Sequence, residues 1–372
     1  MLKKKVLALG AVAIAASLIA APSANAGAKP AVKANVGDEC LRAGTKAPGR
    51  GVNGSDLTCT KVATGSYAGS LRWWYPEMKP LGNLEWVASS AIGGGYGTTA
   101  IAIGDAMKKE GLLKDYTVTY KTNAPLGLGY FYDQKGRNDI LLITGFAMPG
   151  GLATNGSKLS ITTAKAVAGV MREAEAFVVP TSSKYKTIND LLADIKANPK
   201  AVAIGGGNYG GVDHVTVATL AATVGVKATD LNYIPYSGGG SLTPDVIGGR
   251  VDVGIAGTSE FASYVAAGKM RVLAVTSPNT LKVIKGKTLV QQGVNLTFGN
   301  WRGILAPADL SAADYLNLLK VIDTLHASSA WQGTLVTKSW IDEYRAGDAF
   351  QTWIKKENTD IINVLTDFKL VK

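Results

Sequence analysis

Short runs of β-branched and other apolar residues recur along the chain and predict strands. They are bounded by Gly, Pro, Asn and Asp, the residues that end strands and form turns. The predicted strands are residues 84–89, 139–144, 176–180, 201–205, 231–236, 251–257 and 271–277.

Between these runs, apolar residues recur at helical spacing behind helix-start signals. Thr187 and Asp190 form a capping-box pattern, and Ser311 and Asp314 repeat it ahead of a second apolar stripe. Strands that alternate with amphipathic helices are typical of an α/β fold.

The first residues have the pattern of a secretory signal peptide. Three lysines precede an apolar run that ends in the small-residue sequence Ala24-Asn25-Ala26. We expect residues 1–26 to be removed near Ala26-Gly27, so that the mature protein is secreted, periplasmic or extracellular. Residues 27–70 lack apolar periodicity and predict a linker with a small stapled segment. The folded body is expected to begin near residue 71 and to form two domains.

The net charge favours an anionic partner. Loss of the signal peptide leaves a formal charge of +8 from the original +11. The basic residues are scattered and do not alternate with aromatics, which argues against nucleic-acid binding. A small anion or an anionic cell surface fits better.

The two cysteines predict one structural disulfide. Cys40 and Cys59 are too far apart for a CxxC redox or zinc motif, and a signal peptide sends the chain to an oxidising compartment. A Cys40–Cys59 bridge would order a short Gly-rich segment without its own core. No metal site is expected.

Three glycine clusters follow predicted strands and lead into predicted helices, at residues 91–99, 204–211 and 236–244. Glycine permits close backbone approach, and a helix start offers unpaired N–H donors with a partial positive charge. The clusters therefore predict a cradle for an anionic group.

One cluster also matches a dinucleotide fingerprint. Gly205, Gly207 and Gly210 give the G-x-G-x-x-G spacing, and Asp230 follows twenty residues later. In a dinucleotide fold, however, the fingerprint lies in the first βα turn and the acid ends the next strand. Here the match is in mid-chain and Asp230 precedes its strand, so no cofactor is expected.

Catalytic motifs are sparse. The chain has two histidines, and His326 falls on the polar edge of a predicted helix. His214 opens the helix after the second glycine cluster, where the helix dipole should keep it neutral; whether it faces a ligand stays open. Asp213 is read as a helix-start acid rather than a general base. Tyr96 and Tyr209 are either walls of a binding cleft or exposed loop aromatics.

Ordered stretches from residue 84 onward resemble the substrate-binding proteins of tripartite tricarboxylate transporters. They include AIGGGYGTTAIAI, AVAIGGGNYGGVDH, YSGGGSLTPDVIGGRVDVGIAG and NWRGILAP, and the resemblance covers about three quarters of the chain. It implies a two-lobed periplasmic-binding-protein fold of the second type, each lobe a mixed sheet flanked by helices. Lobe 1 would comprise residues 71–179 plus 300–372 and lobe 2 residues 180–299, with the ligand cleft between them.

The resemblance implies a monomeric solute-binding protein and not an enzyme. It would capture a small organic carboxylate, a tricarboxylate such as citrate or a dicarboxylate, and deliver it to membrane permease subunits. Another anion, such as an aromatic acid or a phosphate-like group, is the alternative. A hydrolase or transferase using His214 is a further one.

The ligand-binding residues that we expect lie on the glycine clusters and nearby strand ends. They are Gly94, Gly95, Tyr96, Gly97, Thr98, Phe146, Asn208, Tyr209, Gly210, His214, Ser237, Gly238, Gly239, Ser259 and Arg302. Arg302 would make a charge-assisted contact or else pack on Trp301. Many family members carry an aspartate where Gly97 stands, and Thr98 and Thr99 would supply hydroxyls instead.

Overall fold

A computed structural model describes residues 34–371. The predicted signal peptide and the first part of the predicted linker, residues 27–33, lie outside the described residues. Two large mixed sheets flanked by helices confirm the α/β prediction. Among the described residues, no helix is long and apolar enough to cross a membrane.

The first large sheet has six strands in the order β14-β7-β13-β6-β4-β5. β4 is parallel to both of its neighbours, and β13 is antiparallel to β6 and β7. Its strands are β4 (Leu81–Ala88), β5 (Leu113–Tyr120), β6 (Ile140–Gly145), β7 (Lys165–Glu173), β13 (Asn300–Ala306) and β14 (Arg345–Ala346).

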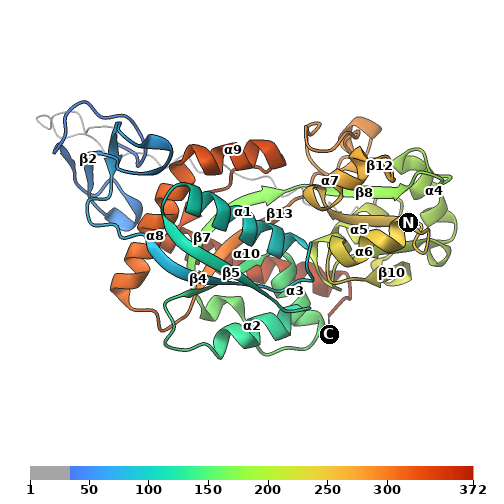
Figure 1. Ribbon diagram of the computed structural model, residues 1–372. Coiled ribbons are helices and arrows are strands. Elements are labelled where there is room, and N and C mark those ends of the chain that lie inside the picture. The colour runs from blue at the N-terminus through green and yellow to red at the C-terminus, as the bar shows by residue number, and fades with distance from the viewer. Residues whose placement is uncertain (1–33, 372) are drawn as a thin grey trace, which may run out of the picture. The chain divides into compact units, whose positions relative to one another are not determined.

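Six helices pack with this sheet, and together they form what we call the first lobe (Figure 1). They are α1 (Gly95–Lys109), α2 (Ala124–Tyr132), α3 (Ala147–Thr154), α8 (Ala312–Ala327), α9 (Ser329–Lys338) and α10 (Gly347–Asp367). Ser311 caps α8 as predicted, because its side chain accepts from the Asp314 N–H.

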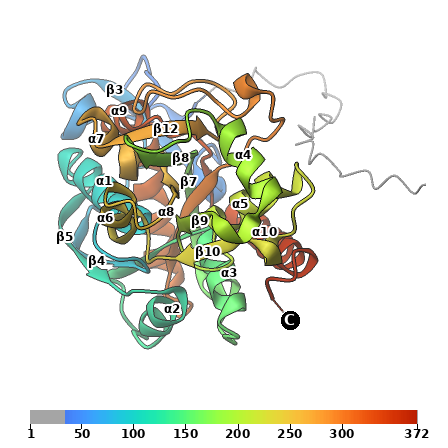
Figure 2. The same cartoon turned by 90° about the vertical axis from the view of Figure 1, so that its right-hand side faces the viewer.

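The second large sheet has five strands in the order β10-β9-β11-β8-β12 and belongs to the second lobe, which faces the viewer in Figure 2. Its strands are β8 (Glu175–Pro180), β9 (Ala203–Gly206), β10 (Asn232–Pro235), β11 (Val253–Gly257) and β12 (Met270–Val275). Its helices are α4 (Ile188–Ala197), α5 (Val212–Ala222), α6 (Gly239–Ile247) and α7 (Thr258–Ala266). The Thr187 capping box of α4 is present as predicted.

The chain first passes between the lobes at Ala174, between β7 and β8. Residues 175–179, which the sequence placed in lobe 1, pair with β11 and β12 of the second sheet. The expected boundary at 180 is therefore five residues late. The boundary was misplaced because residues 166–180 form a nearly continuous apolar run. The hydrophobic pattern of this run does not show where the chain leaves the first sheet and enters the second.

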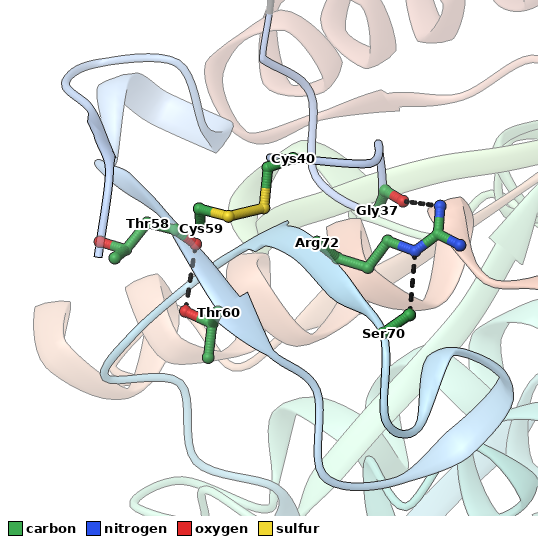
Figure 3. The surroundings of a disulfide bond; sticks show 7 residues. All are labelled: Gly37, Cys40, Thr58, Cys59, Thr60, Ser70 and Arg72. Carbon is green, nitrogen blue, oxygen red and sulfur yellow. Dashed lines mark hydrogen bonds between the residues drawn. A yellow bond between two sulfur atoms is a disulfide. The ribbon is translucent and has the colours of Figure 1, made fainter. Parts of the chain in front are cut away.

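A small third sheet begins the described part of the chain. β1 (Lys46–Ala47), β2 (Leu57–Lys61) and β3 (Leu71–Trp74) are antiparallel, and Cys40 and Cys59 form the predicted disulfide (Figure 3). We call residues 34–75 the N-terminal module. Two expectations for it are wrong. The two-lobed body does not begin at Leu71, because β3 pairs with β2. The module also has a small core, formed by Ala34, Cys40, Ala47, Leu57, Cys59, Trp73 and Tyr75.

The N-terminal module is fixed to the first lobe by polar contacts. Tyr75 Oη donates to Asp323 of α8 at 2.5 Å, and Tyr67 Oη donates to the Ala327 carbonyl at 2.7 Å. The buried Glu110 carboxylate accepts from Ser66 N at 2.7 Å and from Ala330 N, at the start of α9, at 3.2 Å. One carboxylate thereby joins three segments that are far apart in sequence.

Candidate functional site

A small cavity lies between the lobes where the glycine loops meet. Its volume is about 50 Å³. Its walls come from α1, α3, α5, α7, β13 and the loops beside them. They are Ser89, Ser90, Gly95, Tyr96, Ala147, Gly207, Asn208, Gly211, Val212, Asp213, Ser237, Gly238, Glu260, Asn300 and Arg302.

The lobes touch directly on two sides of this cavity. Ala91 N, in the loop before α1, donates to the Ser237 carbonyl of the second lobe at 3.1 Å. Thr154 Oγ1, at the end of α3, donates to the Tyr209 carbonyl at 2.8 Å. We expect a di- or tricarboxylate to enter when the lobes move apart and these two contacts open.

Arg302 is the one cationic side chain among the residues that line the cavity. It lies on β13 between β6 and β7, is 4% exposed, and has its guanidinium 4.8 Å from the centre of the Tyr96 ring. Successive side chains of a strand point to opposite faces. Trp301 accordingly packs away from the cavity on Trp353, and the alternative that Arg302 packs on Trp301 is wrong.

The guanidinium has almost no partners. Its one hydrogen bond runs from Nη1 to the Trp301 carbonyl at 3.4 Å, and Nε is buried without a partner. Within residues 34–371, no carboxylate oxygen lies within 4.0 Å of it. A buried cation is costly unless it is paired, so Arg302 is poised to take an anion.

The start of α1 adds neutral donors next to Arg302. Gly94 is its N-cap and offers no side chain to cap the helix, which leaves the first amides of α1 uncapped. A Cβ built on Gly95 would lie 2.4 Å from Arg302 Nη2, so this helix start and the guanidinium are adjacent. The Ser89 and Ser90 hydroxyls, also on the cavity wall, are buried without partners.

Carboxylates of the chain itself occupy the other glycine-loop amides. Asp213 Oδ2 accepts from Gly207 N at 2.5 Å, and Glu260 Oε2 accepts from Gly239 N at 2.8 Å. Glu173 Oε1 accepts from Ser259 N, at the start of α7, at 2.7 Å. Gly207 N and Gly239 N therefore have partners within the chain, and the expectation that all three loops hold ligand carboxylates through backbone amides stays a prediction.

Burial raises the pKa of three carboxyl groups near the cavity, those of Glu260, Asp213 and Glu175. It raises the pKa of Glu260 to about 8, with the charges of Glu173 and Asp213 adding to the effect. Burial also raises the pKa of Asp213, and burial followed by the charge of Asp213 raises the pKa of Glu175 well above its usual range. Four carboxyl groups thus surround one guanidinium, with fewer than four negative charges near neutral pH.

Six of the expected ligand residues line the cavity: Gly95, Tyr96, Asn208, Ser237, Gly238 and Arg302. The other nine do not line it. Gly94 caps α1, and Gly239 binds Glu260 through its amide. Gly97 allows the Tyr120 ring to pack closely on α1. Thr99, whose hydroxyl was expected to serve the ligand, donates from Oγ1 to the Gly95 carbonyl. The rest are Thr98, Phe146, Tyr209, Gly210, His214 and Ser259.

Tyr209 and His214 line a different, more open pocket of about 380 Å³, together with Tyr233 and Lys369. His214 stacks on Tyr233 at 4.3 Å, and its Nδ1 accepts from Gly210 N at 3.1 Å. Burial lowers the pKa of His214 to about 4, so the ring is neutral as expected, although burial rather than the helix dipole is the cause.

The sequence did not reveal five residues of the cavity wall as site residues: Ser89, Ser90, Asp213, Glu260 and Asn300. Asp213 was noticed only as a helix-start acid. Glu260 directly follows Ser259, an expected site residue. Asn300 is the first residue of the NWRG stretch. Polar residues at the ends of strands that flank glycine loops would have been the usable signal.

Comparisons with known proteins agree with this geometry. A family model described as "Tripartite tricarboxylate transporter family receptor" matches residues 155–335. A UPF0065 protein of Agrobacterium vitis is 30% identical over 129 residues, which are 34% of this chain and 36% of that protein. The match thus spans little more than a third of this curated relative.

Solved structures share the fold over most of the chain. The periplasmic binding protein BugD is 19% identical, with a TM-score of 0.70 over 79% of this chain and 100% of its own. MatC from Rhodopseudomonas palustris, solved with bound malate, is 16% identical, with a TM-score of 0.67 over 77% and 100%. The matching family model and these solved structures are those of transport-associated binding proteins, not of enzymes. Residues 155–335 are thus similar to the tripartite tricarboxylate transporter family receptors, and the chain has a type II periplasmic-binding-protein fold.

Proposed function

We propose that the protein captures a small organic carboxylate outside the cytoplasm and delivers it to the membrane permease subunits of its transporter. The observation that carries this proposal is the unpaired, buried guanidinium of Arg302 beside the uncapped start of α1. A carboxylate can accept two parallel hydrogen bonds from a guanidinium, and a helix start favours negative charge.

The charge of the cavity bears on how many carboxylates the ligand carries. On the cavity wall, Arg302 is the one cation, and Asp213 and Glu260 are the carboxyl groups. A trianion would add three charges to a wall already rich in carboxyls, at a separation where like charges repel strongly. A mono- or dicarboxylate is therefore favoured over citrate, the example that the family resemblance suggested.

The proposal is tested by a ligand screen followed by calorimetry. Succinate, malate, adipate, citrate, benzoate and inorganic phosphate are compared by thermal shift, where a ligand at 100 times its Kd adds about 2.7 kcal/mol to the free energy of unfolding. Isothermal titration then gives Kd for the wild type and for Arg302→Gln. We expect the variant to raise Kd for a carboxylate at least about tenfold, because it loses a charge-assisted contact.

Arg42→Gln is the matched control, because Arg42 is exposed on the N-terminal module and makes the same change in net charge. It should bind like the wild type. Wild-type protein that binds phosphate but none of the organic carboxylates would contradict the proposal, and so would an Arg302→Gln variant that folds and keeps its affinity.

The enzymatic alternative finds no support in the site. Within the described residues, no serine hydroxyl or carboxylate is hydrogen bonded to His214, which accepts from a backbone amide and stacks on Tyr233. A general base must lie within hydrogen-bond reach of the group that it activates. His214 has no such group beside it.

A further inference from the structure

We propose that the cavity selects carboxylates that also carry a hydrogen-bond-donating substituent, a hydroxyl or an ammonium group, and that Glu260 recognises this substituent. The inference rests on the proposed carboxylate-binding function and narrows its ligand class. It follows from an unequal distribution of donors and acceptors between the two lobes.

The first lobe supplies the donors. Arg302, the start of α1 and the hydroxyls of Ser89 and Ser90 all lie on its side of the cavity. Arg302, Ser89 and Ser90 are each at least 94% buried and carry a polar atom without a partner. Unsatisfied buried donors are costly, and a ligand carboxylate would satisfy them.

The second lobe supplies acceptors. The starts of α6 and α7 are already paired with the chain's own carboxyls through Gly239 N and Ser259 N, so they offer a second ligand carboxylate less than the start of α1 does. Glu260 shows this most clearly: Oε2 is fixed by the Gly239 amide, which leaves Oε1 as the free acceptor when the carboxyl is ionised. A Cβ built on Gly95 would lie 3.2 Å from Glu260 Oε1, so this oxygen faces the first lobe across the cavity.

A buried acceptor on the first lobe points to the same ligand chemistry independently of the carboxyls. Asn300 is 4% exposed, lines the cavity and has an Oδ1 atom without a partner. Its amide oxygen can only accept a hydrogen bond. An unsubstituted dicarboxylate offers neither Asn300 nor Glu260 a donor, whereas a hydroxyl or ammonium group does.

A series of three acids tests the proposal. Succinate, malate and aspartate share a four-carbon dicarboxylate skeleton and differ in one substituent, which is hydrogen, hydroxyl or ammonium. For the wild type, titration calorimetry above pH 8, where the Glu260 carboxyl is ionised, should give malate or aspartate a Kd at least about tenfold lower than that of succinate, as expected for a hydrogen bond to a charged group. The order of malate and aspartate then shows whether the hydrogen bond or the charge dominates.

Glu260→Gln assigns the preference to Glu260. The Gly239 N–H will hold the one amide oxygen, so the NH₂ group will face the ligand, and NH₂ cannot accept a hydrogen bond. The preference over succinate should fall to near one. Glu77→Gln is the matched control, because Glu77 is exposed on the surface and makes the same change in charge; it should keep the wild-type ratio.

Two outcomes would overturn this inference and leave carboxylate capture standing. One is succinate binding to the wild type as tightly as both substituted acids, a result that needs no variant to fold. The other is a folded Glu260→Gln protein with the wild-type ratio. If the wild type bound none of the three acids, or if Arg302→Gln bound all of them normally, the proposed function itself would fail.

Discussion

Gly150 of α3 and Gly210 of the second glycine loop meet backbone to backbone across the two lobes. A Cβ built on Gly150 would lie 1.8 Å from the Gly210 carbonyl oxygen, and one built on Gly210 would lie 2.8 Å from the Gly150 carbonyl oxygen. Gly210 also has φ +73°, a conformation that side-chain-bearing residues rarely adopt. Neither position can accept a side chain while the lobes are in contact.

Gly210→Ala should therefore weaken carboxylate binding by hindering lobe contact. Gly225 is the matched control: it has φ +82° and no atom near its Cβ position, so Gly225→Ala has the backbone strain without the clash. Both variants should lower Tm, since the strain costs about 1–2 kcal/mol. Calorimetry should show a higher Kd for Gly210→Ala only. Equal affinities in the two variants would refute the steric explanation.

Ligand should draw the lobes together in solution. The lobes are in direct contact at Ala91–Ser237 and Thr154–Tyr209, and we expect these contacts to separate when a dicarboxylate enters. Small-angle scattering at saturating ligand should give a smaller radius of gyration than the ligand-free protein. An unchanged radius with bound ligand would mean that entry uses a local loop movement instead.

The stability of the ligand-free protein should depend on pH through Glu260. Its pKa is raised from 4.5 to about 8 in the folded protein, so the unfolded chain releases this proton first as pH rises. The Glu260 contribution is fully favourable below about pH 4.5 and is lost as pH rises through about 8. Glu173, Asp213 and Arg302 are the charged groups that act on it.

The comparison of wild type with Glu260→Gln isolates this effect, because His214 acts in the opposite direction. Burial lowers the His214 pKa to about 4, which removes stability as pH falls below about 6.5 in both proteins. Melting curves should show the variant gaining on the wild type as pH rises through about 8. A Tm difference independent of pH would contradict the assignment.

The disulfide should stabilise the N-terminal module without affecting ligand binding. Cys40 and Cys59 enclose a short loop, and the loop-entropy relation gives such a bridge about 3 kcal/mol. The Cys40→Ser, Cys59→Ser double variant should be cleaved faster by protease within residues 34–75 and keep its carboxylate Kd. Loss of binding would show that the module supports the cleft.

Much of the fold could be predicted from the sequence because its strands are apolar runs bounded by turns. All seven predicted strands are present, as are the Thr187 and Ser311 caps. Four strands of the first sheet were missed: β5, β7, β13 and β14. β5 lies at the edge of that sheet, and its Lys, Asp and Thr residues give no apolar run. Propensity is a weak guide for such edge strands.

The site was harder to predict because burial, not residue type, decides its chemistry. The glycine loops meet as expected, yet Asp213 and Glu260 fill two of the amide sites meant for the ligand. These pairings join residues 6 and 21 positions apart. The pairings form because α5 and α7 approach these loops in the folded protein. The spacing of apolar residues in the sequence does not indicate this approach.

The attachment of the N-terminal module determines which part of the molecule moves. Tyr67, Tyr75 and Ser66 of the module are all hydrogen bonded to the first lobe. We therefore expect the module to stay fixed to that lobe when the second lobe moves. Leu41 is fully exposed on this fixed part. A cysteine at position 41 could therefore attach the protein to a surface, or carry a fluorophore, without hindering the movement of the second lobe. That movement could then be measured relative to the attached first lobe.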